Sequence, residues 1–118
     1  MFTLVNINEA KFQQATGRRI AELVSAAVTG TEGVTCRVVE VLPEHQGGAR
    51  QPHTHCDVEE VIFVLEGQGK IWVEEQEKDI LKDDLIVVPM ETEHRIINPG
   101  GQRLWLLCFF PKARVEIP

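Results

Sequence analysis

The sequence predicts an all-β domain, and two observations support this. From residue 34 onward, short runs of β-branched and aromatic residues are separated by turns rich in Gly, Pro and Asp, a pattern typical of a β-sandwich or barrel. The 118 residues are 43% hydrophobic and 25% charged, which is the composition of a globular domain. No repeat, low-complexity segment or linker divides the chain, so we expect a single domain over residues 1–118.

The expected strands follow one another closely. They are VTCRVVEVL (34–42), EVIFVL (60–65), KIWVEE (70–75), ILKDDLIVV (80–88), HRIIN (94–98) and RLWLLCFF (103–110). The segments between them are PEHQGGARQ (43–51), EGQG (66–69), QEKD (76–79), PMETE (89–93) and PGGQ (99–102). We interpret EEQEKD (74–79) as the charged tip of a hairpin.

Residues 9–28 are ambiguous from periodicity alone. Gly17 interrupts a pattern that fits one face of a helix, made up of Phe12, Ile20, Leu23, Val24 and Ala27. Residues 19–24 can equally be read as a strand.

Two expected strands do not alternate between apolar and polar residues. Residues 61–65 and 104–110 are apolar at nearly every position, so both faces of these strands should be covered. One face can be the barrel interior. In a domain this small, we expect a second subunit on the other face, which predicts a homodimer.

Charge and composition narrow the choice of partners and compartment. The net charge of −6 disfavours nucleic acid and anionic membranes as partners. The chain has no apolar run of bilayer length, and its N-terminus lacks the pattern of a secretion signal, so we expect a cytoplasmic protein. Cys36, Cys56 and Cys108 form no C-x-x-C pair and are expected to be reduced. We interpret Cys36 and Cys108 as core residues and Cys56 as incidental to any site.

One short stretch, PHTHCDVEEV, carries the chemistry. On an extended segment, side chains two residues apart point the same way, so His53 and His55 can bind one metal ion. Glu59 and Glu60 both follow within reach of His55, and His94 comes about forty residues later. Three imidazoles and one carboxylate suit Mn, Fe, Co, Ni, Cu or Zn and leave coordination positions open for water, O2 or substrate.

Other residues are weaker candidates. Gln51 has the strand parity of His53 and His55 and is a candidate for contacting substrate, whereas His45 is interpreted as a solvated loop residue. Four arginines are candidates for binding a carboxylate substrate, although exposed arginines in salt bridges are more common: Arg37, Arg50, Arg95 and Arg103. Five aromatic residues are assigned to core or interface, with one or two of them lining a pocket: Phe63, Trp72, Trp105, Phe109 and Phe110.

Two motifs resemble those of the cupins. The first cupin motif is a glycine, H-x-H, a glutamate and a second glycine at set spacings, and the sequence matches all five positions with Gly47, His53, His55, Glu60 and Gly67. Only Glu60 lies at the required distance before Gly67, and its strand parity is opposite to that of Glu59. The resemblance therefore implies that Glu60, and not Glu59, is the ligand.

The second cupin motif is matched in part. Its proline, histidine and asparagine correspond to Pro89, His94 and Asn98, whereas its two glycines are replaced by Asp83 and Glu91. Both replacements fall where the motif expects turns. The resemblance extends from about Val34 to Pro111, with residues 1–33 as additional strands or an arm.

The resemblance implies a double-stranded β-helix of the jelly-roll type, in which residues 19–24 form a strand and dimers are common. It also implies a divalent transition metal held by His53, His55, Glu60 and His94, with Gly47, Gly67 and Asn98 in structural roles. We expect a metal-dependent enzyme acting on a small organic acid, phenolic or sugar-derived substrate. A dioxygenase is slightly favoured over an isomerase or lyase that uses Lewis-acid chemistry or a non-catalytic binding protein. The sequence identifies no general base.

Overall fold

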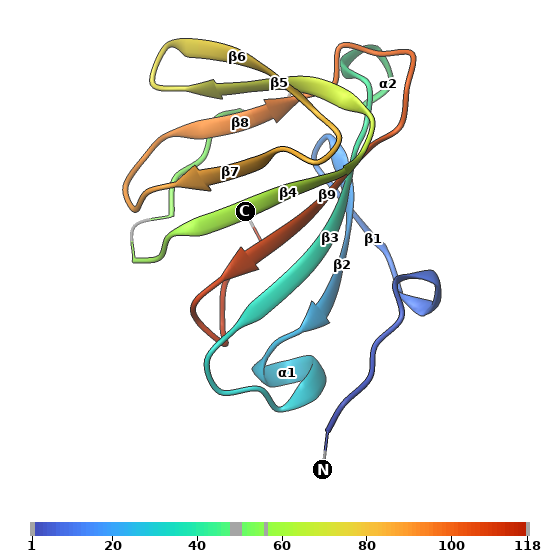
Figure 1. Ribbon diagram of the computed structural model, residues 1–118, viewed down its shortest axis with the longest axis vertical. Coiled ribbons are helices and arrows are strands. Elements are labelled where there is room, and N and C mark those ends of the chain that lie inside the picture. The colour runs from blue at the N-terminus through green and yellow to red at the C-terminus, as the bar shows by residue number, and fades with distance from the viewer. Residues whose placement is uncertain (1, 48–50, 56, 118) are drawn as a thin grey trace.

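Two antiparallel sheets form the domain (Figure 1), and the computed structural model describes residues 2–47, 51–55 and 57–117. The larger sheet has the order β1-β2-β3-β9-β4-β7, and the smaller has the order β6-β5-β8. The strands of the larger sheet are β1 (Gln13–Ala15), β2 (Arg18–Val24), β3 (Thr35–Val41), β9 (Leu104–Phe110), β4 (Glu60–Glu66) and β7 (Leu85–Val88). The smaller sheet contains β5 (Gln68–Val73), β6 (Gln76–Leu81) and β8 (His94–Ile97).

The described helices are short and lie outside the sheets. They are η1 (Ile7–Glu9), α1 (Ala26–Thr29) and α2 (Glu44–Gly47). The Ser25 side chain caps α1 by accepting a hydrogen bond from the backbone of Val28 at 3.1 Å. No helix in the described ranges has the length and apolar character needed to cross a bilayer.

The space between the sheets is filled by alternate residues of each strand. The inward residues of the larger sheet include Ile20, Val39, Val41, Ile62, Val64, Leu104, Leu106, Cys108 and Phe110, and they pack with Ile71 and Ile80 of the smaller sheet. This alternation confirms the expected all-β architecture, because the buried side chains recur every second residue.

The outer face of the larger sheet is covered at one end only. Ala21, Leu23, Cys36 and Val38 are buried there, and residues of the N-terminal arm, including Ile7 and Phe12, pack against them. Over β4, β7 and β9 the outward side chains are partly or largely exposed. The expectation that β4 and β9 are covered on both faces is therefore not met within one chain.

The N-terminal region resolves the ambiguity left by periodicity. Residues 18–24 form β2, which pairs with β3 from Arg18↔Val41 to Val24↔Cys36. The strand expected from the cupin resemblance is therefore correct.

The region between residues 74 and 88 differs from expectation. We expected 74–79 to be a hairpin tip and 80–88 to be one strand, but Gln76–Leu81 is β6 and Leu85–Val88 is β7, in the other sheet. The chain turns at Lys82 and Asp83, and the Asp84 carboxylate accepts the Leu81 N–H at 2.8 Å. A turn stabilised by the Asp84 side chain thus divides what looks like one apolar run.

The motif positions shape the turns as the resemblance implies. Asp83 and Glu91, which replace glycines of the motif, have φ angles of 77° and 60°, so the chain keeps the left-handed conformation that glycine adopts more readily. Asn98 is 1% exposed. Its amide donates to Val41 O (3.0 Å) and Gln102 O (2.9 Å), which ties β3 to the loop after β8.

Gly67→Ala is expected to destabilise the domain. Gly67 has φ +89°, and a Cβ there would lie 1.9 Å from the carbonyl oxygen of Arg103, so the β4–β5 turn would have to move away from the start of β9. We expect a loss of about 2 kcal/mol or more in the free energy of unfolding in urea. Gly33→Ala is the control, because a Cβ at Gly33 meets nothing within 4 Å. Equal stability of the two variants would contradict this role of Gly67.

Candidate metal centre

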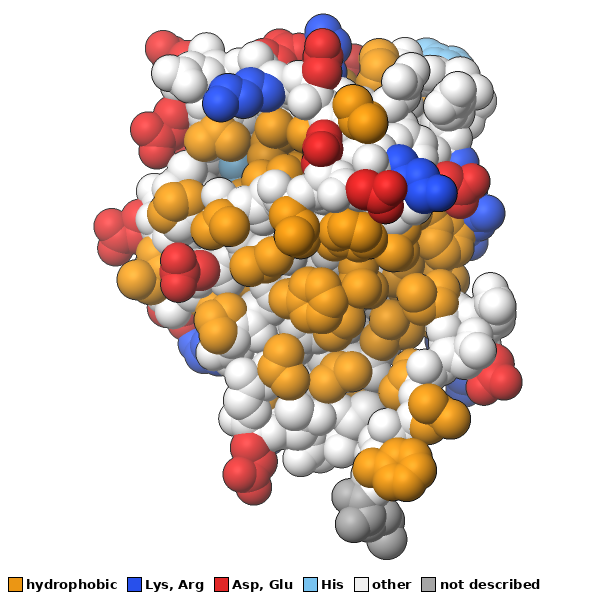
Figure 2. Space-filling model, viewed as in Figure 1, with side chains coloured by type: hydrophobic (Ala, Val, Ile, Leu, Met, Phe, Trp, Pro, Cys, Tyr) orange, Lys and Arg blue, Asp and Glu red, His pale blue; other side chains and the backbone are white. Residues whose placement is uncertain are grey.

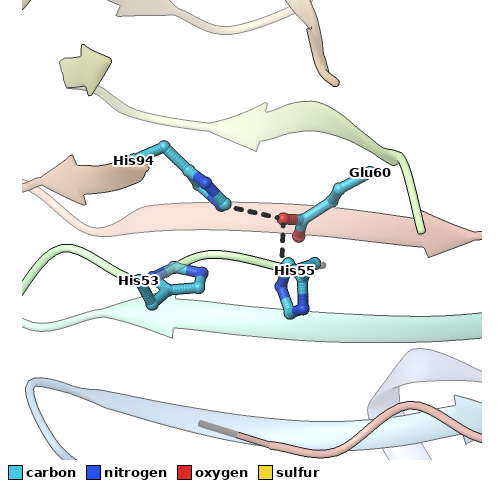
Figure 3. Close-up of side chains that lie close together, drawn as sticks. All are labelled: His53, His55, Glu60 and His94. Atoms are coloured by element: carbon cyan, nitrogen blue, oxygen red, sulfur yellow. Dashed lines mark hydrogen bonds and ion pairs between the residues drawn. The ribbon is translucent and has the colours of Figure 1, made fainter. Parts of the chain in front are cut away.

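Four side chains that are distant in sequence meet inside the barrel at one end of the sheets. They are His53, His55, Glu60 and His94, and their possible ligand atoms all lie within 4.8 Å of one another. Glu60 Oε1 is 3.1 Å from His94 Nε2 and 3.7 Å from His55 Nε2 (Figure 3). Glu60 is on β4 and His94 on β8, so the cluster joins the two sheets.

Backbone hydrogen bonds hold the H-x-H segment in place. His53 and His94 form an antiparallel bridge, in which each backbone N–H donates to the other residue's carbonyl at 2.9 Å. The N–H of Glu91 also donates to the carbonyl of His55 at 2.8 Å. The two histidines are thereby attached to the start of β8, although the segment itself is not part of a named strand.

The surroundings of His94 fix how its ring can act. Its Nδ1 is 2.9 Å from the carbonyl oxygen of Thr92, which can only accept, so Nδ1 carries a proton. The other nitrogen, Nε2, faces the Glu60 carboxylate. Because a carboxylate and an imidazole lone pair repel each other, a cation must lie between them, either a second proton or a metal ion.

Glu60 and Glu59 have opposite environments. Glu60 is 6% exposed, whereas Glu59 is exposed to solvent. Burial, followed by the negative charge of Glu60, raises the pKa of the Cys108 thiol well above its usual value. Cys108 is therefore a neutral neighbour of the cluster and not a thiolate.

The cluster forms part of the wall of a cavity of about 60 Å³. Most of the remaining wall is aliphatic or aromatic, including Ile62, Leu106 and Phe110. The ring centroids of His55 and Phe110 are 5.1 Å apart. A second hollow, of about 660 Å³, lies against residues 112–116 and also reaches His55.

The donor set fits a divalent transition metal. Such an ion lies about 2.0–2.2 Å from nitrogen and oxygen ligands, so ligands on opposite sides of it are about 4 Å apart. Small side-chain rotations would bring the four groups to that separation. One carboxylate and three imidazoles are a borderline donor set that suits Mn, Fe, Co, Ni, Cu and Zn.

The weaker candidates have varied positions. Gln51 is exposed and is not among the cavity-lining residues, so the geometry gives no support to a substrate contact by its side chain. His45 is exposed on α2 and is not part of the histidine cluster. Cys56 and Arg50 lie outside the described residues. Cys36 and Cys108 are buried and form no disulfide, as expected of core residues.

The aromatic and arginine candidates divide between the two faces of the sheet. Phe110 lines the cavity, whereas Trp105 packs on the outer face. Arg103 is half-exposed and pairs with Glu40. In contrast, Arg37 is buried and lines the cavity.

Arg18 also lines the cavity and was not identified as a candidate from the sequence. It is 3% exposed. The signal that could have revealed it is strand parity, because Arg18 is two residues before the core residue Ile20 and so faces the same side of β2.

Comparison with known proteins identifies the domain. The cupin-domain family matches residues 38–110, which is more than half of the chain. An uncharacterised protein of Methanocaldococcus jannaschii is 36% identical over 56 residues, covering 48% of this chain and 45% of that protein.

Several solved structures share the fold. A polyketide cyclase from Streptomyces resistomycificus aligns with a TM-score of 0.79 and 21% identity, covering 94% of this chain and 80% of that one. An oxalate decarboxylase from Lactobacillus farciminis, in complex with formate, aligns with a TM-score of 0.77 and 23% identity over 92% of this chain. This chain spans only 32% of that enzyme and less than half of the M. jannaschii relative.

These structural similarities are at low identity and bear on the fold alone, which they show to be the cupin barrel. The family match covers both the glutamate and the histidine motifs on β4 and β8. The chain belongs to the cupin family.

Proposed function

We propose that this cupin is a metal-dependent enzyme acting on a small organic molecule, with His53, His55, Glu60 and His94 as the metal ligands. The observation that carries the proposal is the convergence of three imidazoles and one buried carboxylate on one point of a cavity. When bound, the ion would supply Lewis acidity or a position for O2 beside the substrate.

The chain's own residues would prepare the site for this chemistry. The carbonyl of Thr92 orients the His94 ring and leaves Nε2 available to the ion. Ile62, Leu106 and Phe110 give the cavity a partly apolar wall, and low-polarity surroundings strengthen electrostatic interactions. The bridge between His53 and His94 keeps the ligands together before any ion binds.

Two reaction classes suit such a site. The expectation drawn from the sequence slightly favours the first class, oxidation with O2 as in a dioxygenase. The structurally similar proteins favour the second class, Lewis-acid catalysis, because they include an oxalate decarboxylase and a polyketide cyclase. These activities are those of the other proteins and support only a proposal for this chain.

Turnover with and without oxygen distinguishes the classes. Protein loaded with Fe(II) or Mn(II) is mixed with a panel of small acids, phenols and sugar acids, while oxygen uptake and products are followed by electrode and mass spectrometry. Oxygen consumption coupled to product supports a dioxygenase, and equal turnover without oxygen supports an isomerase or lyase. Ligand binding without any product would contradict an enzyme and favour a binding protein.

Glu60→Gln is expected to lower metal affinity by about 10-fold or more. Mutating a residue that only hydrogen-bonds to a metal ligand already lowers metal affinity by roughly 10–100-fold, and Glu60 is proposed as a ligand itself. His94→Ala should have at least as large an effect. Metal content after purification without chelators or a metal-affinity tag, followed by titration with Zn(II) or Mn(II), measures both.

Glu59→Gln is the matched control, since Glu59 has the same chemistry but is exposed. Its metal affinity should equal that of the wild type. Equal losses in the two glutamine variants would contradict the assignment of Glu60.

We also propose that the chain forms a homodimer through the outer face of β7, β4 and β9. Apolar residues face each other in rows across these strands, with Val87, Val61 and Phe109 in one row and Leu85, Phe63 and Leu107 in the next. Figure 2 shows hydrophobic side chains gathered across the middle of this face. Leu85 and Val87 are 66% and 62% exposed, and a second copy of the chain would cover them.

Leu85→Lys should convert the dimer to a monomer, because it places a charge within the proposed apolar contact. Light scattering coupled to size-exclusion chromatography gives the mass. Leu81→Lys is the control, since Leu81 is similarly exposed at 57% but lies on β6 in the other sheet. A wild-type protein that is monomeric at high micromolar concentration would rule out this interface.

A further inference from the structure

Two arginines lie inside the barrel with the histidine cluster. Arg18 and Arg37 are 3% and 2% exposed, and both line the same cavity as Glu60 and His94. Arginines are rarely buried to this extent unless they are paired. The adjacent Arg19 points to the outer face, where it forms an ion pair with Glu40, so the chain places only one of the two neighbouring charges in the interior.

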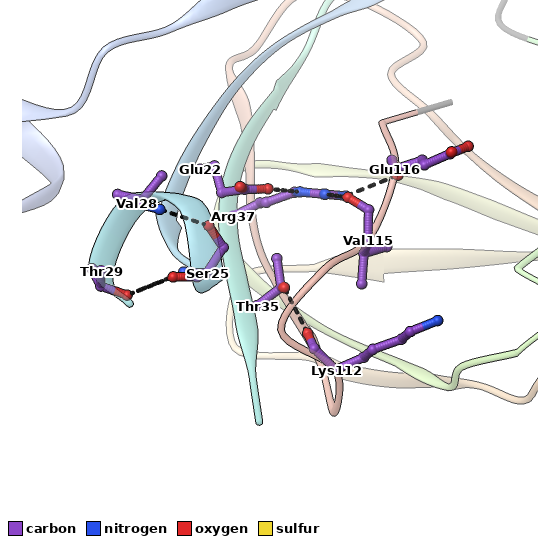
Figure 4. Close-up of polar contacts among 9 residues, drawn as sticks. All are labelled: Glu22, Ser25, Val28, Thr29, Thr35, Arg37, Lys112, Val115 and Glu116. Carbon is purple, nitrogen blue, oxygen red and sulfur yellow. Dashed lines mark hydrogen bonds and ion pairs between the residues drawn. The ribbon is translucent and has the colours of Figure 1, made fainter. Parts of the chain in front are cut away.

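Arg37 is held rigidly near the cluster. It lies opposite Cys108 in the register of β3 and β9, and Cys108 in turn lies opposite Ile62, two residues after Glu60. Its Nε donates to Glu22 at 2.9 Å. The two terminal nitrogens donate to the carbonyls of Val115 and Glu116 in the C-terminal segment (Figure 4).

These contacts do not use up the donors of Arg37. A guanidinium has five N–H groups, and three of them donate to described residues. The acceptors on the terminal nitrogens are neutral carbonyls, and Glu22 is the only carboxylate among these three partners. Arg37 can therefore also donate to an anion in the cavity.

Arg18 brings a second positive charge to the same space. Its Nη1 donates to the carbonyl of Thr16 at 3.1 Å. Burial lowers the pKa of Arg18, and the nearby charge of Arg37 lowers it further. The charge of Glu60 raises it. The two guanidiniums thus repel each other within a low-dielectric cavity, which costs folding free energy that a bound anion would offset.

A metal ion would add positive charge to this cavity. A divalent cation on the cluster carries more charge than the carboxylate of Glu60 neutralises. The wall also holds Glu44 and Arg95, whose opposite charges offset each other, and Glu22 pairs with Arg37. The metal ion would then attract one end of a small anion in the cavity, and the arginines would attract the other end. Its volume of about 60 Å³ holds several water molecules, which limits a ligand to few non-hydrogen atoms.

We propose that Arg18 and Arg37 bind the carboxylate of a small organic acid whose other end lies at His53, His55, Glu60 and His94. This inference rests on the proposed metal-dependent function and narrows its substrate class to carboxylates. The planar guanidinium suits the recognition, because it can donate two parallel hydrogen bonds to one carboxylate.

Calorimetric titration of the metal-loaded protein with malonate and malonamide tests the proposal. The two probes have nearly the same shape, but only malonate is charged. We expect malonate to bind at least about 10-fold more tightly, because only its carboxylates can form charge-assisted hydrogen bonds with the guanidiniums. This comparison uses the wild-type protein and does not depend on the stability of any variant.

Arg18→Gln should weaken malonate binding about 10-fold or more, and Arg18→Lys should weaken it less because the charge remains. Arg37→Lys should also weaken it, with thermal unfolding measured in parallel because Arg37 anchors Glu22 and the C-terminal segment. Arg19→Gln is the matched control and should bind malonate like the wild type.

The outcomes separate this inference from the proposed function. If each protein retains its metal but malonamide binds as well as malonate, or Arg18→Gln binds malonate normally, carboxylate recognition by the arginines is wrong and the metal site stands. If the wild type takes up no stoichiometric metal, the proposed function fails. Arginine-dependent malonate binding by that metal-free protein would still support the anion site.

Discussion

The buried carboxylate of Glu60 is the constraint on which the site depends. A carboxylate that is 6% exposed in a largely apolar barrel requires a cation or several hydrogen-bond donors beside it. The structure supplies imidazoles from two directions, with His94 from β8 and His55 from the segment bridged to it. The smaller sheet must therefore lie close to the start of β4, and the same closure forms the cavity.

Strand alternation gives the larger sheet two different surfaces. On β2, Arg18 and Ile20 face the cavity while Arg19 and Ala21 face outward. On β9, Cys108 and Phe110 line the cavity while Phe109 is 36% exposed on the outer face. Because the period is two residues, one strand serves both the proposed metal pocket and the proposed dimer contact. A register shift of one residue would abolish both.

The departures from the cupin motif show which of its features the fold requires. Asp83 and Glu91 occupy glycine positions of the second motif and still adopt positive φ. The surrounding hydrogen bonds fix these turns, since the Glu91 N–H donates to the carbonyl of His55 and the Asp83 N–H donates to that of Val64. The backbone conformation is thus retained without glycine, at some cost in strain. Gly67 is different, because a neighbouring backbone leaves no space for a Cβ.

The sequence by itself determined the features that depend on local pattern. Runs of β-branched and aromatic residues between turn residues predicted the strands from residue 34 onward, and motif spacing with strand parity selected Glu60 over Glu59. Only the tertiary structure separated β6 from β7, buried Arg18 and Arg37 in the cavity, and left β4 and β9 open on one side. These features depend on which distant segments pack together. A charged residue such as Arg18 has the same local signal whether its strand faces solvent or a closed barrel, so its environment is decided by long-range packing and not by its sequence neighbours.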